Sequence, residues 1–267
     1  MPSEILLDIT ATARLRRYLA QSSWERRNHT SYTAFVAYAN RDSTPFRERY
    51  NIPEAQTIIR GTLRYQGFPE FVRVLVDIGF LSEETNDFLK PSDKPLLWAE
   101  ATQKVLKASS NQESDLIWAI SSKTKFTNNE EKGRILAGLK WIGLFSSDPI
   151  TPRNTPLDTL CASLEQKMQY EPGERDMVML QHKFEIEHSD GRKETRTSTL
   201  CDYGDPKGYS SMARLVGVPC GVACLRVLDG SIKEKGILAP VTWELAEPLL
   251  VELREKWGIE MVEKTLV

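Results

Sequence analysis

The 267-residue sequence has little of what a metal centre or a disulfide framework needs. It contains four cysteines, none in a Cys-x-x-Cys pair, and only three histidines. Structural zinc sites and small disulfide-rich domains depend on closely spaced cysteine and histidine, so neither is expected here. Lysine and arginine number 35 against 37 aspartate and glutamate, a net charge of −2. This balance gives no overall charge with which to bind nucleic acid or an anionic membrane.

The sequence also shows neither long apolar runs nor nucleotide-binding motifs. No apolar run reaches the length of a membrane span, and no signal peptide is recognisable, so we expect a cytoplasmic protein. There is no P-loop, and no Gly-x-Gly-x-x-Gly motif follows a predicted strand. Gly204 and Gly208 precede a predicted helix but lack the motif's spacing. A plain loop is favoured there over an anion site at the helix N-terminus.

Helical patterns dominate the first part and the middle of the chain. Apolar residues at helical spacing predict one helix over residues 1–30. From Phe71 to about residue 170, helical patterns follow one another. Thr127–Glu130 reads as a capping box and Thr155 as the N-cap of a further helix. This stretch predicts an all-helical subdomain.

The C-terminal part alternates between strand and helix patterns. A helix is predicted from Gly208 to Leu228, which Gly217 and Pro219 either kink or split in two. Another is predicted from Pro248 to Trp257. Alternating or β-branched runs predict strands at 33–39, 56–65, 176–187, 193–201 and 259–265, the third and fourth joined by a hairpin turn.

Arginines stand at the ends of the first two predicted strands. Asn40 and Arg41 follow the strand 33–39, and the second strand carries Arg60 and Arg64. If the strands are neighbours, Arg41, Thr62 and Arg64 can converge at one sheet end. Guanidinium groups bind carboxylates through two parallel hydrogen bonds, and a threonine hydroxyl adds a donor. The pattern therefore favours a site for a small molecule with several carboxylates.

Internal ion pairing explains the same arginines equally well at this point. Arg41 can pair with Asp42, and Arg64 with Glu70. No catalytic residue can be named from the sequence: His182 lies on the apolar face of its strand, where a core histidine is favoured over a catalyst. Asp42 is within reach in principle, without a further argument for it.

Several longer stretches resemble a known family. They read AYANRDSTPFRERYNIPEA, IIRGTLRYQGFPEFVRVLVDIGFL, GLKWIGLF, ITPRNTPLDTLCASLEQKMQYEPGERDMVMLQHKFEIE and RTSTLCDYG. From about Thr33 to the C-terminus, the chain is similar to fungal saccharopine reductase, also called saccharopine dehydrogenase (NADP+, L-glutamate-forming). The resemblance implies an NADP-dependent oxidoreductase of lysine biosynthesis, which interconverts saccharopine with glutamate and aminoadipate semialdehyde.

The resemblance also implies an α+β fold. Family members have a Rossmann domain, which this chain is expected to lack, and a substrate domain with a mostly antiparallel sheet like the second domain of glyceraldehyde-phosphate dehydrogenase. An all-helical insertion interrupts that substrate domain. The expected divisions are an unmatched N-terminal helix (1–30), the substrate domain (31–72 and 171–207), the helical subdomain (73–170), and C-terminal helices with a short strand that in the family return to the nucleotide domain (208–267).

The family's substrate contacts fall on the arginine-bearing strands. The resemblance implies that Arg41, Thr62, Leu63 and Arg64 contact saccharopine. The full-length family uses NADP, but no cofactor is expected to bind this chain alone. The chain therefore reads as truncated and inactive alone, as a non-catalytic amino-acid-binding module, or as an interaction subunit completed by a separate nucleotide-binding chain.

The C-terminal helices bear on possible partners. Without a nucleotide domain to cover them, Val218, Val222 and Leu225 are expected to form an exposed apolar patch. This predicts either a homo-oligomer or a Rossmann-domain partner. Neither nucleic acid nor a membrane is expected as a partner.

Overall fold

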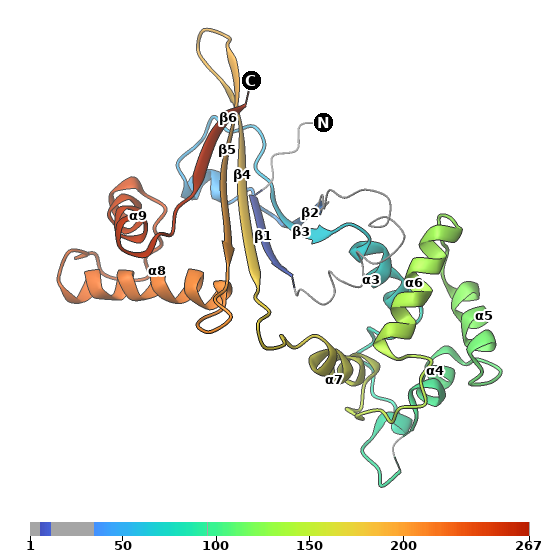
Figure 1. Ribbon diagram of the computed structural model, residues 1–267. Coiled ribbons are helices and arrows are strands. Elements are labelled where there is room, and N and C mark those ends of the chain that lie inside the picture. The colour runs from blue at the N-terminus through green and yellow to red at the C-terminus, as the bar shows by residue number, and fades with distance from the viewer. Residues whose placement is uncertain (1–5, 12–34, 95, 267) are drawn as a thin grey trace. The chain divides into compact units, whose positions relative to one another are not determined.

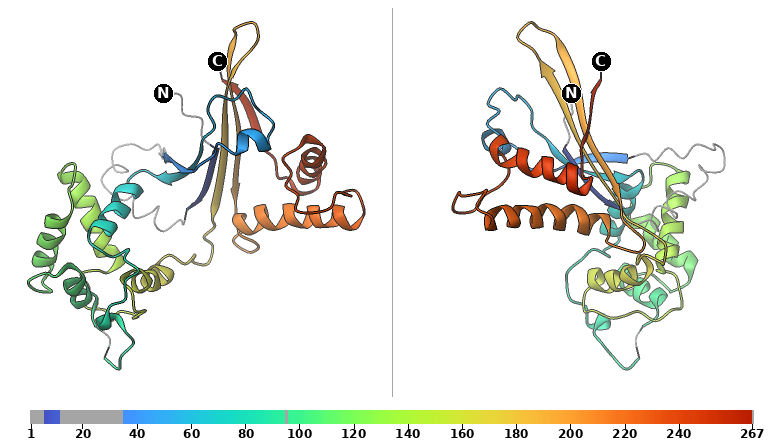
Figure 2. Two further views of the ribbon diagram at one scale, coloured as in Figure 1. Left: turned by 180° about the vertical axis from the view of Figure 1, so that it is seen from behind. Right: turned by 60° about the vertical axis from the view of Figure 1, so that its left-hand side comes forward.

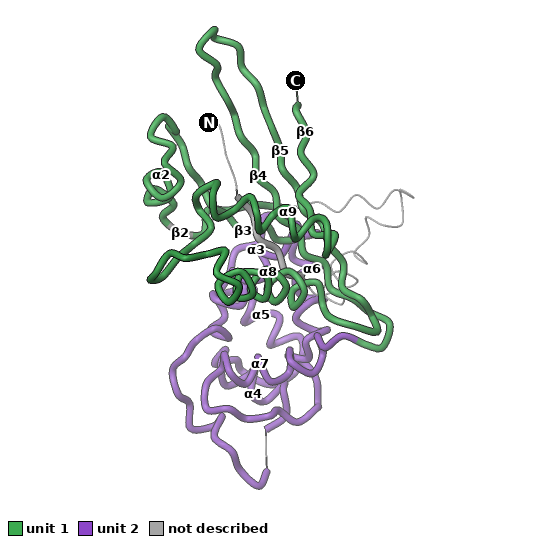
Figure 3. The backbone as a smooth tube through the Cα atoms, turned by 90° about the vertical axis from the view of Figure 1, so that its left-hand side faces the viewer, with its two compact units in different colours: residues 1–13, 35–64, 171–267 green, residues 14–34, 65–170 purple. Residues whose placement is uncertain are grey.

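The chain divides into two compact units. The computed structural model describes residues 6–11, 35–94 and 96–266 (Figure 1). The sheet unit comprises residues 1–13, 35–64 and 171–267, and the helical unit comprises residues 14–34 and 65–170 (Figure 3). The six-stranded sheet lies in the first unit and the second unit is built from helices, so the architecture is α+β, as expected.

The sheet unit is built on six strands in the order β2-β3-β1-β4-β5-β6. β1 pairs in parallel with β3, and the pairs β1–β4, β4–β5 and β5–β6 are antiparallel. Figure 2 shows the long β4–β5 hairpin of this unit from two sides. The strands are β1 (Leu6–Ala11), β2 (Phe35–Arg41), β3 (Arg60–Tyr65), β4 (Met177–Glu187), β5 (Lys193–Tyr203) and β6 (Val262–Leu266).

The helix predicted over residues 1–30 is wrong where the structure describes it, because Leu6–Ala11 forms β1. The sequence there also fits a strand, since Leu7, Ile9 and Ala11 recur with a period of two. β1 is paired on both sides, with β3 and with β4, and this pairing overrides a local helical pattern. The rest of the predicted helix lies outside the described residues.

The remaining predicted strands are confirmed, with shifted ends. β3 begins at Arg60 rather than at residue 56, and β5 continues to Tyr203. The hairpin register runs from Met177 opposite Tyr203 to Glu187 opposite Lys193. Gly191 has a φ of +82° in the turn, a conformation that glycine adopts without strain.

The helical unit encloses an apolar core. Phe80, Ile120 and Leu139 are among its fully buried side chains. The elements are α3 (Phe68–Asp77), η1 (Asp87–Leu89), α4 (Trp98–Leu106), α5 (Glu113–Lys123), α6 (Asn129–Ile142) and α7 (Pro156–Lys167). Each amphipathic helix therefore buries its apolar side within the unit.

Two predicted helix starts have different outcomes. The predicted N-cap Thr155 is confirmed, because its side chain accepts a hydrogen bond from the Asp158 N–H at 3.0 Å. The capping box lies one residue later than predicted. Asn128 caps α6 by accepting from the Glu131 N–H, and a Glu131 carboxylate oxygen accepts from the Thr127 N–H. Asparagine and threonine both make good caps, so their order along the sequence does not fix the start.

Two C-terminal helices belong to the sheet unit. α8 (Ser211–Leu228) is a single helix that retains Pro219, so the split considered from the sequence does not occur. α9 (Trp243–Trp257) starts five residues before the predicted Pro248, which lies inside it. α8 contacts both α9 and β4. Tertiary contacts offset the backbone hydrogen bonds that both prolines remove.

α8 is also more apolar than the sequence analysis expected. Its 18 residues have a mean hydropathy of 1.5, long and apolar enough by length and composition to cross a membrane. The expectation that no run reaches this length is therefore wrong. The helix nevertheless carries two arginines bound within the sheet unit: Arg214 pairs with Asp202 and Arg226 with Glu252. These ion pairs favour a helix docked on the sheet unit.

Candidate anion-binding site

The predicted site residues lie on two neighbouring strands. β2 and β3 are hydrogen-bonded neighbours in the sheet, as the site hypothesis required. Side chains alternate between the two faces of a strand, so Thr62 and Arg64 share one face with Arg60, and Leu63 points to the other. Thr62 and Leu63 are buried, whereas Arg60 and Arg64 are half-buried. β3 thus presents two guanidinium groups with a hydroxyl between them.

The end of β2 lies beside the start of β3. Arg41 is the last residue of β2, and the hydroxyl of buried Ser43 accepts the Arg60 N–H at 2.9 Å. Arg64 is four residues further along β3, about 13 Å at the usual rise per residue. The sequence analysis placed Arg41, Thr62 and Arg64 at one sheet end. The structure places the backbone of Arg41 at the end of β2, near the start of β3, and the backbones of Thr62 and Arg64 two and four residues after Arg60.

The two arginines of β3 have different surroundings. A terminal nitrogen of Arg64 donates to the Leu63 carbonyl oxygen at 2.8 Å. The guanidinium carbon of Arg60 lies 4.6 Å from the centroid of the Phe46 ring, which comes from the short helix α2 (Phe46–Arg49). Arg49 also approaches this ring, at 5.4 Å. Cations within about 6 Å of a ring centroid are attracted by its electrons.

Asp42 is held as an anion beside this site. Its carboxylate accepts hydrogen bonds from the Thr44 N–H at 3.0 Å and the Thr44 hydroxyl at 2.8 Å. The backbone hydrogen bond, followed by the hydroxyl, keeps the pKa of Asp42 below its usual value. A carboxyl group with a lowered pKa is ionised near neutral pH, so Asp42 is a poor proton donor.

Charge in this part of the sheet unit favours an anionic ligand. The segment 41–64 contains five arginines but only two glutamates and one aspartate. Arginine is the residue best suited to planar carboxylates, because its fork of N–H groups matches both oxygens. The five arginines are Arg41, Arg47, Arg49, Arg60 and Arg64.

The N-terminus of α8 is already occupied by an internal carboxylate. Buried Asp176 accepts from the Ser211 N–H at 2.7 Å and from the Met212 N–H at 2.9 Å. Gly204 packs so closely that an added Cβ would lie 2.1 Å from an Asp176 oxygen. The sequence analysis favoured a plain loop over an anion site at Gly204–Gly208. This has a physical basis, because the helix N–H groups that would bind a phosphate already donate to Asp176.

The N-terminus of α8 therefore offers no free pair of backbone N–H groups to the phosphates of a dinucleotide. In α8, which follows Gly204 and Gly208, the first backbone N–H groups donate hydrogen bonds to Asp176. Within the part of the chain that the structure describes, no group of three or more His, Cys, Asp or Glu side chains could hold a metal ion. His182 is half-buried, and this burial lowers its pKa, which favours its neutral form.

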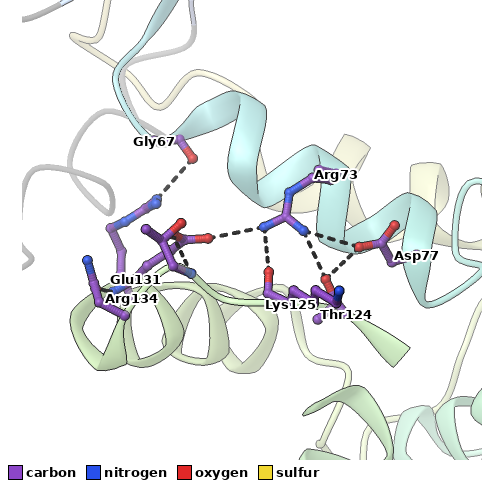
Figure 4. A network of polar contacts seen from close by, with 9 residues as sticks. Gly67, Arg73, Asp77, Thr124, Lys125, Glu131 and Arg134 are labelled. Carbon is purple, nitrogen blue, oxygen red and sulfur yellow. Dashed lines mark hydrogen bonds and ion pairs between the residues drawn. The ribbon is translucent and has the colours of Figure 1, made fainter. Parts of the chain in front are cut away.

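The helical unit carries a polar network and a separate apolar cavity. Arg73 of α3 binds Asp77, Thr124, the Lys125 carbonyl oxygen and Glu131 (Figure 4). Sequence reasoning missed this network because its members lie up to 58 positions apart. The cavity, of about 200 Å³, is lined by apolar side chains such as Phe71, Leu75 and Leu160, so it offers no partner for a carboxylate.

Arg134 of α6 fixes the start of α3. It donates to the Gly67 carbonyl oxygen at 2.9 Å, and Gly67 has a φ of +92° (Figure 4). An alanine Cβ at Gly67 would lie 2.4 Å from an Arg134 nitrogen. Glycine is therefore required at Gly67, the second glycine of the GTLRYQG stretch, both by its backbone conformation and by a close neighbour.

Known proteins of similar sequence were identified over most of the chain. A protein from Pyricularia oryzae, "Saccharopine dehydrogenase [NADP(+), L-glutamate-forming]", is 61% identical over 236 residues, which cover 87% of this chain and 52% of that protein. The protein of the same name from Saccharomyces cerevisiae is 56% identical over 233 residues, with the same coverage. The chain thus spans about half the length of the curated relatives it matches.

A solved structure and a family model agree with these relatives. The structure is the apo histidine-tagged saccharopine dehydrogenase (L-Glu forming) from Saccharomyces cerevisiae, with a TM-score of 0.85 and 45% identity, covering 99% of this chain and 66% of that one. The family model describes the saccharopine dehydrogenase C-terminal domain and matches residues 2–259. The match begins within residues 1–30, which the sequence resemblance left out. The chain belongs to the saccharopine dehydrogenase C-terminal domain family.

Proposed function

We propose that this chain is the saccharopine-binding part of an NADP-dependent, L-glutamate-forming saccharopine dehydrogenase. The names of its fungal relatives and the excess of arginine over acidic residues on and between β2 and β3 support the proposal. Saccharopine carries three carboxylates and is a secondary amine, so it needs several guanidinium partners. The reaction interconverts saccharopine with glutamate and aminoadipate semialdehyde in lysine biosynthesis.

The proposed roles follow from the residue types. Arg41 and Arg64 bind carboxylates, the Thr62 hydroxyl donates a further hydrogen bond, and Leu63 contributes its backbone and its packing. The observation that carries the proposal is the placement of half-buried Arg64 on the same face of β3 as buried Thr62, with Arg41 at the end of the neighbouring strand β2. These residues bind and orient the substrate.

The hydride donor lies outside this arrangement. NADP is named for the fungal relatives, whereas Asp176 already binds the backbone N–H groups at the N-terminus of α8, so this helix end is not a phosphate site. The chain's own contribution to imine reduction is therefore substrate binding and the exclusion of water. A non-catalytic amino-acid-binding or interaction module is the second candidate, favoured by the same occupied helix end.

The division of the chain supports a domain proposal. The sheet unit corresponds to the substrate domain that resembles the second domain of glyceraldehyde-phosphate dehydrogenase, and the helical unit to an insertion in it. The order of the chain supports this, because residues 65–170 leave the sheet unit after β3 and return before β4. The exposed apolar side of α8 would contact a Rossmann domain or a second copy of the chain.

The test of substrate binding is titration calorimetry of the full chain with saccharopine. Arg64→Ala should weaken binding about tenfold or more, because a hydrogen-bonded charged pair contributes about 1.5–3 kcal/mol. Arg64→Lys should recover only part of the loss, since lysine keeps the charge without the fork. No measurable binding by the wild type, or wild-type affinity in Arg64→Ala, would contradict the proposal.

The two candidate functions separate in a second assay. Saccharopine-dependent reduction of NADP, followed by absorbance, should be absent for the chain alone if it only binds substrate. Activity of the chain alone would contradict the proposal that this chain contributes substrate binding only. Activity that appears only with a Rossmann-domain protein would support a two-part enzyme over a stand-alone binding module.

A further inference from the structure

Arg60 is a third arginine of this site, and its role is not covered by the proposed contacts. It opens β3, its side chain is half-buried, and its guanidinium carbon lies 4.6 Å from the Phe46 ring centroid. Among the described carboxylates, none lies within ion-pairing distance of it. Asp42, near it across the strand end, is bound by Thr44 instead.

The surroundings hold Arg60 in place without neutralising it. The Ser43 hydroxyl fixes its backbone N–H at 2.9 Å, and Phe46 supports the flat guanidinium group. An aromatic ring attracts the face of a guanidinium and leaves the N–H groups at its edge available for an anion. A partly desolvated cation is stabilised when a carboxylate meets those groups.

The spacing along β3 matches the length of saccharopine. Arg60 and Arg64 share one face of the strand and lie about 13 Å apart along it, with Thr62 between them. In saccharopine, about ten bonds separate the lysine-derived carboxyl carbon from the distal carboxyl carbon of the glutamate part. An extended polypeptide covers about 12 Å over a similar number of bonds.

We infer that Arg60 binds one terminal carboxylate of saccharopine and Arg64 the other, so that the ligand lies along β3 over Thr62. This inference rests on the proposed function, because it assumes that saccharopine binds this face. Arg41, at the end of β2 beside Arg60, then belongs to the Arg60 end of the ligand. Three arginines thus meet three carboxylates.

The first test is calorimetry of the full chain with saccharopine and variants at Arg60. Arg60→Ala should weaken binding about tenfold or more, and Arg60→Lys should also bind more weakly than the wild type. Arg175→Ala is the matched control, because Arg175 also lies over an aromatic ring, 4.8 Å from the Tyr203 centroid, but is exposed and lies outside the arginine-rich segment 41–64. It should stay within about twofold of the wild type.

A double variant tests whether the two arginines bind different carboxylates. Sites more than about 10 Å apart act independently, so the affinity loss in Arg60→Ala/Arg64→Ala should equal the product of the single losses within about twofold. A smaller combined loss would mean that both bind one carboxylate and would overturn the inference. Circular dichroism of each variant checks folding, and Arg60→Lys keeps the test valid if Arg60→Ala does not fold.

The outcomes separate this inference from the function on which it rests. Wild-type affinity in both Arg60 variants, with a loss in Arg64→Ala, would overturn the role of Arg60 and leave the proposed function standing. An absence of saccharopine binding by the wild-type chain would overturn both. Losses at both positions that multiply in the double variant would support both.

Discussion

At the scale of single residues, Gly67 shows how tightly the start of the helical unit is specified. Its φ is +92° and the Arg134 guanidinium lies where a Cβ would be. Gly67→Ala should lower the free energy of unfolding by more than 2 kcal/mol, since a left-handed alanine alone costs about 1–2 kcal/mol. Urea denaturation measures the difference.

Gly79 of the same unit provides the matched control for Gly67. Its φ is +85°, but an added Cβ would meet only the Val105 side chain at 3.7 Å, an ordinary contact. Gly79→Ala should therefore show the backbone cost without the clash. Equal losses for the two alanine variants would mean that Arg134 moves aside at no cost, contrary to this prediction.

The sequence identifies some of the site residues for physical reasons and leaves others out. Arginines next to predicted strand ends single out Arg41 and Arg64, and strand alternation puts Thr62 on the same side as Arg64. Only the family resemblance adds Leu63. The Ser43–Arg60 hydrogen bond and the Phe46 support depend on how the chain folds back after β2, which local patterns do not encode.

At the scale of elements, Asp176 determines how α8 begins. Its carboxylate accepts two backbone N–H groups of the first turn, and Ser211 there is fully buried. Asp176→Ala should destabilise the protein by about 1–3 kcal/mol, because it removes a cap and leaves buried donors unsatisfied. Hydrogen exchange should be faster at the amides of residues 211 and 212 than in the wild type.

Ser210→Ala is the control for the start of α8. The Ser210 hydroxyl accepts from the Ala213 N–H at 3.1 Å, but Ser210 is exposed to solvent. Its loss should cost about 1 kcal/mol or less, since water can replace an exposed acceptor. An equal loss in both variants would show that the Asp176 carboxylate has no special importance.

Element prediction succeeds where one local signal dominates. β4 and β5 alternate regularly around a turn with Asp190-Gly191, and Thr155 with Pro156 marks the start of α7. The N-terminal strand was missed because its apolar spacing fits both a helix and a strand. Its identity is decided by two partners distant in sequence, which no window along the chain contains.

At the scale of the whole molecule, α8 presents several exposed apolar side chains along one helix. Val216, Leu225, Val227 and Leu228 are more than half exposed, whereas Val222 is buried against the sheet unit, contrary to the expected patch of Val218, Val222 and Leu225. The exposed side also carries small residues, Gly217, Cys220, Gly221 and Cys224, which allow close approach.

This surface predicts self-association of the chain in the absence of a partner domain. Light scattering should show a mass that rises with concentration, and Val216→Glu should shift it toward the monomer, because a charge opposes burial of the patch. Val76→Glu is the control, since Val76 is similarly exposed on α3. A wild-type chain that stays monomeric at high concentration would contradict the prediction.

The register of the sheet has a consequence for how this chain can be rearranged. β1 pairs Asp8 with Thr62 on one side and Thr10 with Val178 on the other. Continuing the β1–β3 register by two residues puts Arg64 level with Val178, two strand spacings away, or about 10 Å. The chain thus leaves and re-enters the sheet at one end of β1. A linker of about three residues could bridge that distance. Residues 66–170 can therefore be treated as a segment that recombination could exchange without removing a residue of any described strand.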